Sequence, residues 1–220
     1  MLYYFLTYLD RLYDIPGFGV FRYITFRAGA AAVTALTIAF WIGPKIIRKL
    51  KEQQIGESAK LEAPKTHLSK AGTPTMGGLI VLASGVIPVL LWADVKNAYI
   101  LLILFVTVAL GAVGFLDDYL KVVKKKTQGL IGRYKIVGQV FVGMVVGSVI
   151  YFHPEWIDAA LTPLKSKTTV PFLKNLEVDF GILYIPVVVF IITATSNAVN
   201  LTDGLDGLAI GTVGIVITTL

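Results

Sequence analysis

The sequence predicts an all-α protein that crosses a membrane several times. Of its 220 residues, 55% are hydrophobic and only 15% are charged, whereas a soluble domain usually carries about 25% charged residues. The apolar residues also stand in long uninterrupted runs, and not in the amphipathic stripes of a soluble core. A bilayer core of about 30 Å takes about 20 residues of helix, which matches these runs. The composition excludes a disordered or fibrous chain, and the lack of cysteine excludes a disulfide scaffold.

Six runs without a charged residue define the predicted helices in order. The first five have 17, 23, 20, 17 and 23 residues, and we expect them to span the membrane, the first and fourth with polar-ended extensions. The sixth has 14 residues, so we expect a partial sixth helix. All belong to one transmembrane domain over residues 1–220, with no separate soluble domain. The runs are Ala28–Pro44, Ala71–Ala93, Asn97–Leu116, Ile136–Phe152, Phe180–Thr202 and Gly207–Leu220.

Thirteen of the 20 basic residues lie in two segments between predicted spans, Lys45–Lys70 and Lys121–Lys135. With five spans of alternating direction, both segments fall on one side, and the positive-inside rule makes that side cytoplasmic. The N-terminus and the loop 153–179 are then outside, where residues 170–180 could form a small hairpin. Because the basic residues lie beside the spans, we attribute the net charge of +6 to a membrane surface and not to nucleic acid.

Polar residues at the cytoplasmic ends of the spans are the candidates for function, because ionisable groups near lipid are costly. The first cluster, residues 70–78, leads into the second span. Pro74 suits the first helical turn, and Thr73 or Thr75 can cap it. The N–H groups of a helix start attract anions, and Lys70 adds a full charge. An ordinary helix cap with a packing pair of glycines explains the same residues equally well.

The second cluster, Asp117 and Asp118 with Lys121, ends the third span. Adjacent acids oppose the helix dipole at a C-terminus, so local stability does not explain them. Asp117 and Lys121 can pair at i,i+4, whereas Asp118 lies about 100° around the helix. Two neighbouring carboxylates suit both Mg²⁺ and general-base chemistry. The alternative interpretation is a solvated helix end with one ion pair.

The third cluster, NAVNLTDGLDG at residues 197–207, follows the fifth span. Asn197, Asn200 and Asp203 recur every three residues and would share a face of a continuing helix, which Asp206 extends. Carboxamides and carboxylates at this place need a polar ligand or a metal; otherwise the segment is a polar turn between spans. Four acids with a basic rim indicate a Mg²⁺-dependent enzyme for a phosphorylated substrate, one substrate being a lipid phosphate.

The motifs GTPTMGG, GFLDDYLKV and NAVNLTDGLDGLA, in this order, resemble the phospho-N-acetylmuramoyl-pentapeptide-transferases. These form a branch of the polyprenyl-phosphate N-acetylhexosamine-1-phosphate transferases, and the resemblance covers residues 23–220. It implies transfer of phospho-MurNAc-pentapeptide from a UDP-linked donor to undecaprenyl phosphate with Mg²⁺, giving lipid I and UMP. This is the first membrane step of peptidoglycan synthesis, at the bacterial cytoplasmic membrane. A homodimer is also implied, and lysine at position 121, where related GlcNAc-phosphate transferases carry an acid, favours this branch.

The resemblance implies roles in catalysis for the second cluster. Asp117 would deprotonate or orient the lipid phosphate, and Asp118 would assist at the metal-phosphate cluster. Lys121 and Lys125 would bind phosphate, and the metal ligands in this chain would be Asp117, Asp118 and Asn200. Direct attack by the lipid phosphate and a two-step route through an aspartyl intermediate both remain open. An anionic nucleophile that needs only positioning and charge neutralisation favours direct attack.

The same resemblance assigns the donor nucleotide to the first and third clusters. Lys70 and Asp206 would contact its uracil end, and Thr75, Asn200 and Asp203 would line its ribose and pyrophosphate. The family has a bundle of ten spans, a later acid that binds Mg²⁺ and a histidine-rich loop. We therefore expect this chain to be the N-terminal part of a larger transferase and to be inactive alone.

Three other functions fit the same sequence. A related GlcNAc-1-phosphate transferase would use the same clusters, and a non-catalytic fragment would only bind lipid phosphate or a partner helix. A transporter would also place acids on membrane helices, but near the midplane and on interrupted helices. In this sequence the acids gather at one face of the predicted bundle, which favours an enzyme at the membrane surface.

Overall fold

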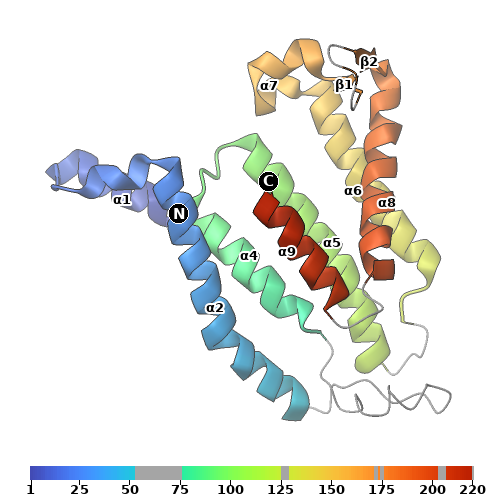
Figure 1. The fold of residues 1–220 in the computed structure, drawn as a ribbon, viewed down its shortest axis with the longest axis horizontal. Coiled ribbons are helices and arrows are strands. Elements are labelled where there is room, and N and C mark those ends of the chain that lie inside the picture. Colours follow the sequence, from blue (N-terminus) through green and yellow to red (C-terminus); the bar gives the residue numbers. More distant parts are fainter. Residues whose placement is uncertain (53–75, 125–128, 171–172, 174–175, 203–206, 220) are drawn as a thin grey trace. The chain divides into compact units, whose positions relative to one another are not determined.

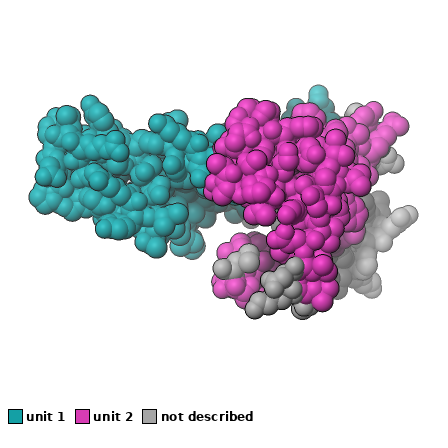
Figure 2. Space-filling model, turned by 90° about the horizontal axis from the view of Figure 1, so that it is seen from above, with its two compact units in different colours: residues 1–131 teal, residues 132–220 magenta. Residues whose placement is uncertain are grey.

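The computed structural model describes residues 1–52, 76–124, 129–170, 173, 176–202 and 207–219. These residues are mostly helical, with one small two-stranded sheet, as the sequence predicts. The chain divides into two compact units, Met1–Ile131 and Gly132–Leu220, shown in two colours in Figure 2. Each unit is described by itself below.

The first unit holds the N-terminal helices (Figure 1). Helix α2 packs against α4, and α4 packs against α5. The Trp92 indole N–H donates to the Thr34 hydroxyl at 3.0 Å and joins α4 to α2. A Cβ placed on Gly111 of α5 would lie 2.7 Å from the Leu82 side chain, so this glycine permits the close approach of α5 to α4. The elements are α1 (Leu2–Tyr13), η1 (Phe18–Arg22), α2 (Ile24–Glu52), α4 (Gly78–Trp92) and α5 (Ala98–Val122).

The second unit holds the C-terminal helices and the sheet. Helix α6 packs along α8, and short helical turns and the two strands lie between them in sequence. The elements are α6 (Gly132–Phe152), α7 (Pro154–Ile157), η2 (Ala159–Leu164), β1 (Lys167–Thr169), β2 (Glu177–Asp179), η3 (Gly181–Leu183), α8 (Tyr184–Thr202) and α9 (Leu208–Thr219).

Four helical segments of the described chain are long and apolar enough to cross a membrane: Ile24–Leu50, Ala98–Lys121, Gly132–Phe152 and Gly181–Thr202. They correspond to the first, third, fourth and fifth predicted spans. The second predicted span is present as α4, which has only 15 residues. Its helix begins at Gly78 because Met76 has a φ of 70°, in the left-handed region. Residues 71–75, including the predicted cap, lie outside the described residues, so the count of five spans stays a prediction.

Helix α1 runs sideways from the ends of α2 and α4 instead of along them (Figure 1). Its contacts with them are polar. The α-amino group of Met1 donates to the carbonyl of Leu91 at 3.0 Å, at the end of α4. Asp10, only 8% exposed, pairs with Arg22 at 2.7 Å just before α2 begins. These polar contacts therefore hold α1 beside the end of α4 and the start of α2.

The other face of α1 is apolar and open. Met1, Phe5, Tyr8 and Leu12 recur at helical spacing on this face, and each is more than half exposed. Asp10 lies on the opposite side of the helix. The helix thus differs from a helix of a soluble protein, because the charged Asp10 faces protein and the apolar stripe faces outward.

Helices α6 and α8 of the second unit approach closely through glycine. A Cβ placed on Gly143 would lie 2.7 Å from the Cα of Val189, and one on Gly147 would lie 3.2 Å from the Cα of Ile185. Small residues four positions apart are the usual contact of packed membrane helices. Val142, buried at 2% exposure, fills the same interface.

The loop between α6 and α8 contains the predicted hairpin, whose first strand lies earlier than expected and whose second strand lies where it was predicted. The strands β1 and β2 are antiparallel, with Thr168 opposite Val178. The Ser166 hydroxyl donates to the Asp179 carboxylate at 2.6 Å, and this bond, more than any other contact, lowers the pKa of Asp179. The bond between Ser166 and Asp179 joins the two ends of the hairpin that lie away from its turn, so the strands form at 167–169 and 177–179. Residues 171–172 and 174–175, where the turn was predicted, lie outside the described residues.

Candidate active site

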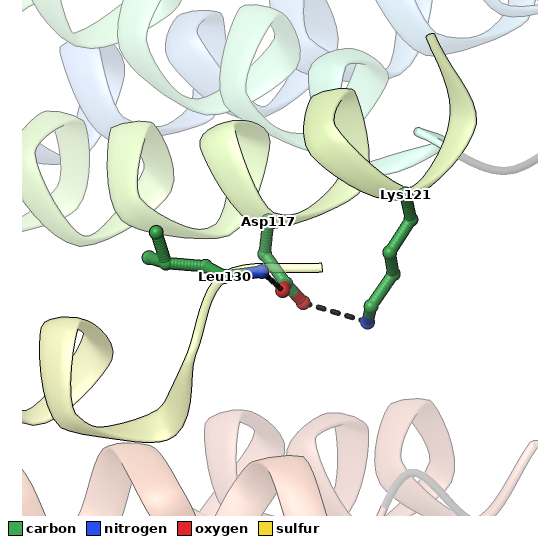
Figure 3. Close-up of polar contacts among 3 residues, drawn as sticks. All are labelled: Asp117, Lys121 and Leu130. Carbon is green, nitrogen blue, oxygen red and sulfur yellow. Dashed lines mark hydrogen bonds and ion pairs between the residues drawn. The ribbon is translucent and has the colours of Figure 1, made fainter. Parts of the chain in front are cut away.

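Asp117 lies near the end of α5 and is only 7% exposed. One carboxylate oxygen, Oδ2, accepts a hydrogen bond from the Lys121 ammonium at 2.7 Å. The other, Oδ1, accepts from the backbone N–H of Leu130 at 2.8 Å, as Figure 3 shows. The predicted i,i+4 pair is therefore confirmed. The contact with Leu130 also brings the chain beyond α5 back to the helix.

Burial separates this site from a simple solvated helix end. The ion pair of that interpretation exists, but the Asp117 carboxylate is withdrawn from water, whereas 44% of the Lys121 side chain is exposed. A buried carboxylate is tolerated only with hydrogen-bonding partners, and bonds from an ammonium and an N–H to a carboxylate are strong. The pair thus leaves the ammonium partly exposed while the carboxylate stays buried. Asp118, the next residue, is half-buried.

The donor atoms of this site suit a magnesium ion. Asp117 and Asp118 supply carboxylate oxygens, the hard ligands that Mg²⁺ prefers. Among the residues that the structure describes, no group of three or more His, Cys, Asp or Glu side chains comes together as a metal site. Asp203 and Asp206, the other two acids of the predicted site, lie outside the described residues. The chemistry of the donors therefore fits Mg²⁺, and the set of ligands remains a prediction.

The second unit carries the polar end of α8. The Asn197 amide donates to the side-chain oxygen of Gln139 at 2.7 Å, and the Gln139 amide donates to the Ser196 hydroxyl at 3.1 Å. Gln139 belongs to α6 and is 6% exposed. Asn200, one turn further along α8, is exposed. Of the two predicted asparagines, one therefore holds α8 to α6, and the other is open to a ligand.

The structure describes four of the nine predicted site residues. Asp117 and Lys121 are in contact, Asp118 follows them on α5, and Asn200 lies in the other unit. The predicted nucleotide and phosphate contacts Lys70, Thr75, Lys125, Asp203 and Asp206 lie outside the described residues.

Two residues of these sites were not predicted from the sequence. Leu130 acts through its backbone N–H, so its side chain carries no signal; the preceding Gly129 is the only hint of a special turn. Gln139 did carry a signal, because a carboxamide in an apolar run must find a partner within the protein. It lies in the fourth charge-free run, Ile136–Phe152.

Comparison with known proteins gives consistent matches. The sequence model described as glycosyl transferase family 4 matches residues 100–220. A shorter pattern, phospho-N-acetylmuramoyl-pentapeptide-transferase signature 1, matches residues 70–82. Proteins named phospho-N-acetylmuramoyl-pentapeptide-transferase from Chloroherpeton thalassium and Chlorobaculum parvum are each 54% identical over all 220 residues. The one from Chlorobium chlorochromatii is 54% identical over 212 residues, 96% of this chain. The chain spans 58%, 58% and 56% of the length of these relatives.

Proposed function

The chain belongs to glycosyl transferase family 4, whose sequence model matches more than half of it, and we propose that it acts as a phospho-N-acetylmuramoyl-pentapeptide transferase. The reaction joins phospho-MurNAc-pentapeptide from its UDP-linked donor to undecaprenyl phosphate and releases UMP. The observation that carries this proposal is 54% identity along the whole chain to proteins of that name. The buried, hydrogen-bonded Asp117 at the end of an apolar helix supports it, because a lipid phosphate reaches protein at such a place.

The chemistry asks little of the protein beyond positioning. A phosphate oxygen of the lipid attacks the phosphorus that carries the sugar, the bond from that phosphorus to UMP breaks, and UMP leaves with the electron pair. Lys121 binds and neutralises phosphate oxygens, since its ammonium is partly exposed. Asp117 orients the lipid phosphate through the same lysine. No proton has to leave an anionic nucleophile, so direct attack is favoured over an aspartyl intermediate.

Magnesium is the proposed cofactor, with Asp117, Asp118 and Asn200 as its ligands in this chain. When bound, Mg²⁺ neutralises the phosphate charge that builds up during transfer. The nucleotide is proposed to lie against Lys70, Thr75, Asp203 and Asp206. A homodimer, five spans with a partial sixth, and a single transmembrane domain complete the proposal, together with a cytoplasmic active site and an outer N-terminus.

Nucleotide binding tests the function directly. The purified full chain in lipid nanodiscs is titrated calorimetrically with UDP-MurNAc-pentapeptide. We expect saturable binding that weakens about tenfold or more in Asp203→Ala, because a hydrogen bond to a charged group is lost. Asp158→Ala, an exposed acid of the outer loop, is the matched control and should bind as the wild type does.

The same titration separates the alternatives. Equal affinity for UDP-GlcNAc would favour the related GlcNAc-1-phosphate transferases. Absence of saturable binding for both nucleotides would contradict a transferase and favour a lipid-phosphate-binding fragment or a transporter. Mg²⁺-dependent transfer to undecaprenyl phosphate by the purified chain would show that it does not need further protein for activity.

A further inference from the structure

Gly129 lies where the chain returns to α5, and its backbone has a φ of 60° in the left-handed region. The residue is buried. Its neighbour Leu130 donates its N–H to Asp117 Oδ1 at 2.8 Å, as the short segment beside the carboxylate in Figure 3 shows. The turn at Gly129 and Leu130 therefore contacts Asp117, the residue that is central to the proposed function.

A side chain at Gly129 would displace its neighbours. A Cβ there would lie 2.5 Å from Asp117 Oδ1 and 2.6 Å from Lys121 Cε. Real Cβ atoms essentially never come closer than 3.0 Å to another heavy atom, so the carboxylate and the lysine stem would have to shift. The glycine thus suits the positive φ, and its lack of a side chain leaves room for the two side chains packed on it.

The two hydrogen bonds restrict the carboxylate from opposite ends. Rotation of a carboxylate about χ2 is broad and has no deep minima of its own. The Leu130 N–H on Oδ1 and the Lys121 ammonium on Oδ2 remove this freedom. If the Leu130 N–H moved away, this restraint on Oδ1, opposite the Lys121 ammonium, would be lost. The backbone at residues 129–130 therefore contributes to the direction in which the carboxylate points.

We propose that the Gly129–Leu130 peptide is a positioning element for Asp117 and Lys121, which fixes the carboxylate and the ammonium in the arrangement that receives phosphate. The proposal rests on the proposed function only for the identity of that phosphate. The arrangement itself can be measured without any substrate.

Two substitutions separate this role from that of an ordinary turn. Gly129→Ala suffers both from its φ and from the collision. Gly129→Asn tolerates a positive φ, as asparagine often does, but it brings the same Cβ against Asp117 and Lys121. A residue needed only for its turn is therefore rescued by Asn, whereas a positioning residue is not. Gly17 is the matched control site, because its φ is 91° and a Cβ there meets nothing within 4 Å.

The measurement is the reactivity of the Lys121 amine. The full chain in nanodiscs is labelled with trace acetic anhydride, and mass spectrometry gives the ratio of modification at Lys121 to that at exposed Lys124. An amine held against a carboxylate by a hydrogen bond is less accessible to the reagent than one released from it. We expect this ratio near neutral pH to rise about three- to fivefold in both Gly129 variants, the scale of one ion pair of about 1 kcal/mol. Asp117→Asn supplies the unpaired limit, and Gly17→Ala and Gly17→Asn should leave the ratio unchanged.

The outcomes decide the proposal. A wild-type ratio in both Gly129 variants, or restoration by Asn alone, would overturn it. If neither variant folds by circular dichroism, a backbone ester at Leu130 removes the N–H and adds no atom; it should raise the ratio, and an unchanged ratio would again overturn the proposal. Failure of the nucleotide titration would instead count against the proposed function and would leave the Lys121 result standing.

Discussion

Asp94, in the turn between α4 and α5, accepts hydrogen bonds from the Tyr4 hydroxyl and from the N–H of Lys96, the latter at 3.0 Å. These donors, Tyr4 first, lower the pKa of Asp94 below its ordinary value of 3.8. The folded chain therefore favours the ionised carboxylate more than the unfolded chain does. This contribution to stability is fully present above the unfolded pKa, and it is lost as the pH falls through the lower folded pKa.

Replacing Tyr4 with Phe should return the pKa of Asp94 toward its ordinary value and lower the Tm at pH 7. The difference in Tm between wild type and Tyr4→Phe should shrink below about pH 4, because Asp94 becomes protonated in both chains. Thermal denaturation followed by circular dichroism between about pH 3 and about pH 7 measures this difference. Tyr8→Phe is the control, since Tyr8 is exposed and lies one helical turn further along α1. A difference in Tm that stays constant over this range would contradict the role of Asp94.

At Asp117 the sequence predicted one contact and could not predict the other. The pair with Lys121 follows from the geometry of a helix, in which residues four apart are neighbours. The bond from Leu130 joins residues whose separation in the chain corresponds to no regular spacing. It depends on where the chain beyond α5 returns, and a backbone N–H leaves no trace in the sequence. Gly129 was visible only as one glycine among 21.

At the scale of helices, the packing of α6 against α8 depends most on one residue without a side chain, Gly143. Gly143→Ala would place a methyl group 2.7 Å from the Cα of Val189, and backbone cannot move aside as a flexible side chain can. We expect a loss of about 1–3 kcal/mol in the free energy of unfolding, the usual cost of overpacking. Equilibrium unfolding in mixed detergent micelles measures this loss.

Gly85→Ala in α4 is the matched control for this change. It lies in another apolar helix, and a Cβ there meets nothing within 4 Å. It should leave the unfolding free energy unchanged or raise it slightly, because alanine favours helix over glycine. Equal losses at both positions would mean that helix propensity, and not the contact between α6 and α8, determines the result.

The helices were easier to predict than their ends. A run without charge identifies a membrane helix because each apolar side chain there lowers the cost of insertion. The sequence does not predict the start of α4 at Gly78. This start depends on the left-handed backbone at Met76, and a methionine gives no sign of such a backbone because residues other than glycine rarely adopt it. The second strand of the hairpin lies where it was predicted, but the first lies earlier, because the bond between Ser166 and Asp179 joins positions that local alternation does not connect.

For the whole molecule, the orientation in the membrane is a prediction from charge. The chain has no cysteine, so single cysteines report on single positions. Arg48→Cys lies in the basic extension of α2, and Asp158→Cys lies in the loop between α6 and α8; both sites are exposed. A membrane-impermeant maleimide should label position 158 in intact spheroplasts and position 48 only after permeabilisation. The reverse pattern would contradict a cytoplasmic active site, and labelling of both in intact cells would indicate a chain that is not inserted.

The sequence does not predict which helices are neighbours. Hydropathy tells which segments enter the bilayer, but contacts among them depend on small residues such as Gly111 and Gly143, and glycine occurs throughout the spans. The docking of α1 was equally hidden, because its bonds join the N-terminus to residues about ninety positions away.

This docking limits how far the first membrane helix can slide through the bilayer. If α2 slid by one turn, about 5.4 Å, so that α1 moved into the bilayer, the ion pair of Asp10 and Arg22 would approach hydrocarbon, where ionised side chains are costly. If α2 slid in the opposite direction, the apolar stripe of Phe5, Tyr8 and Leu12 would be exposed to water. The charged pair and the apolar stripe of α1 therefore oppose sliding in either direction.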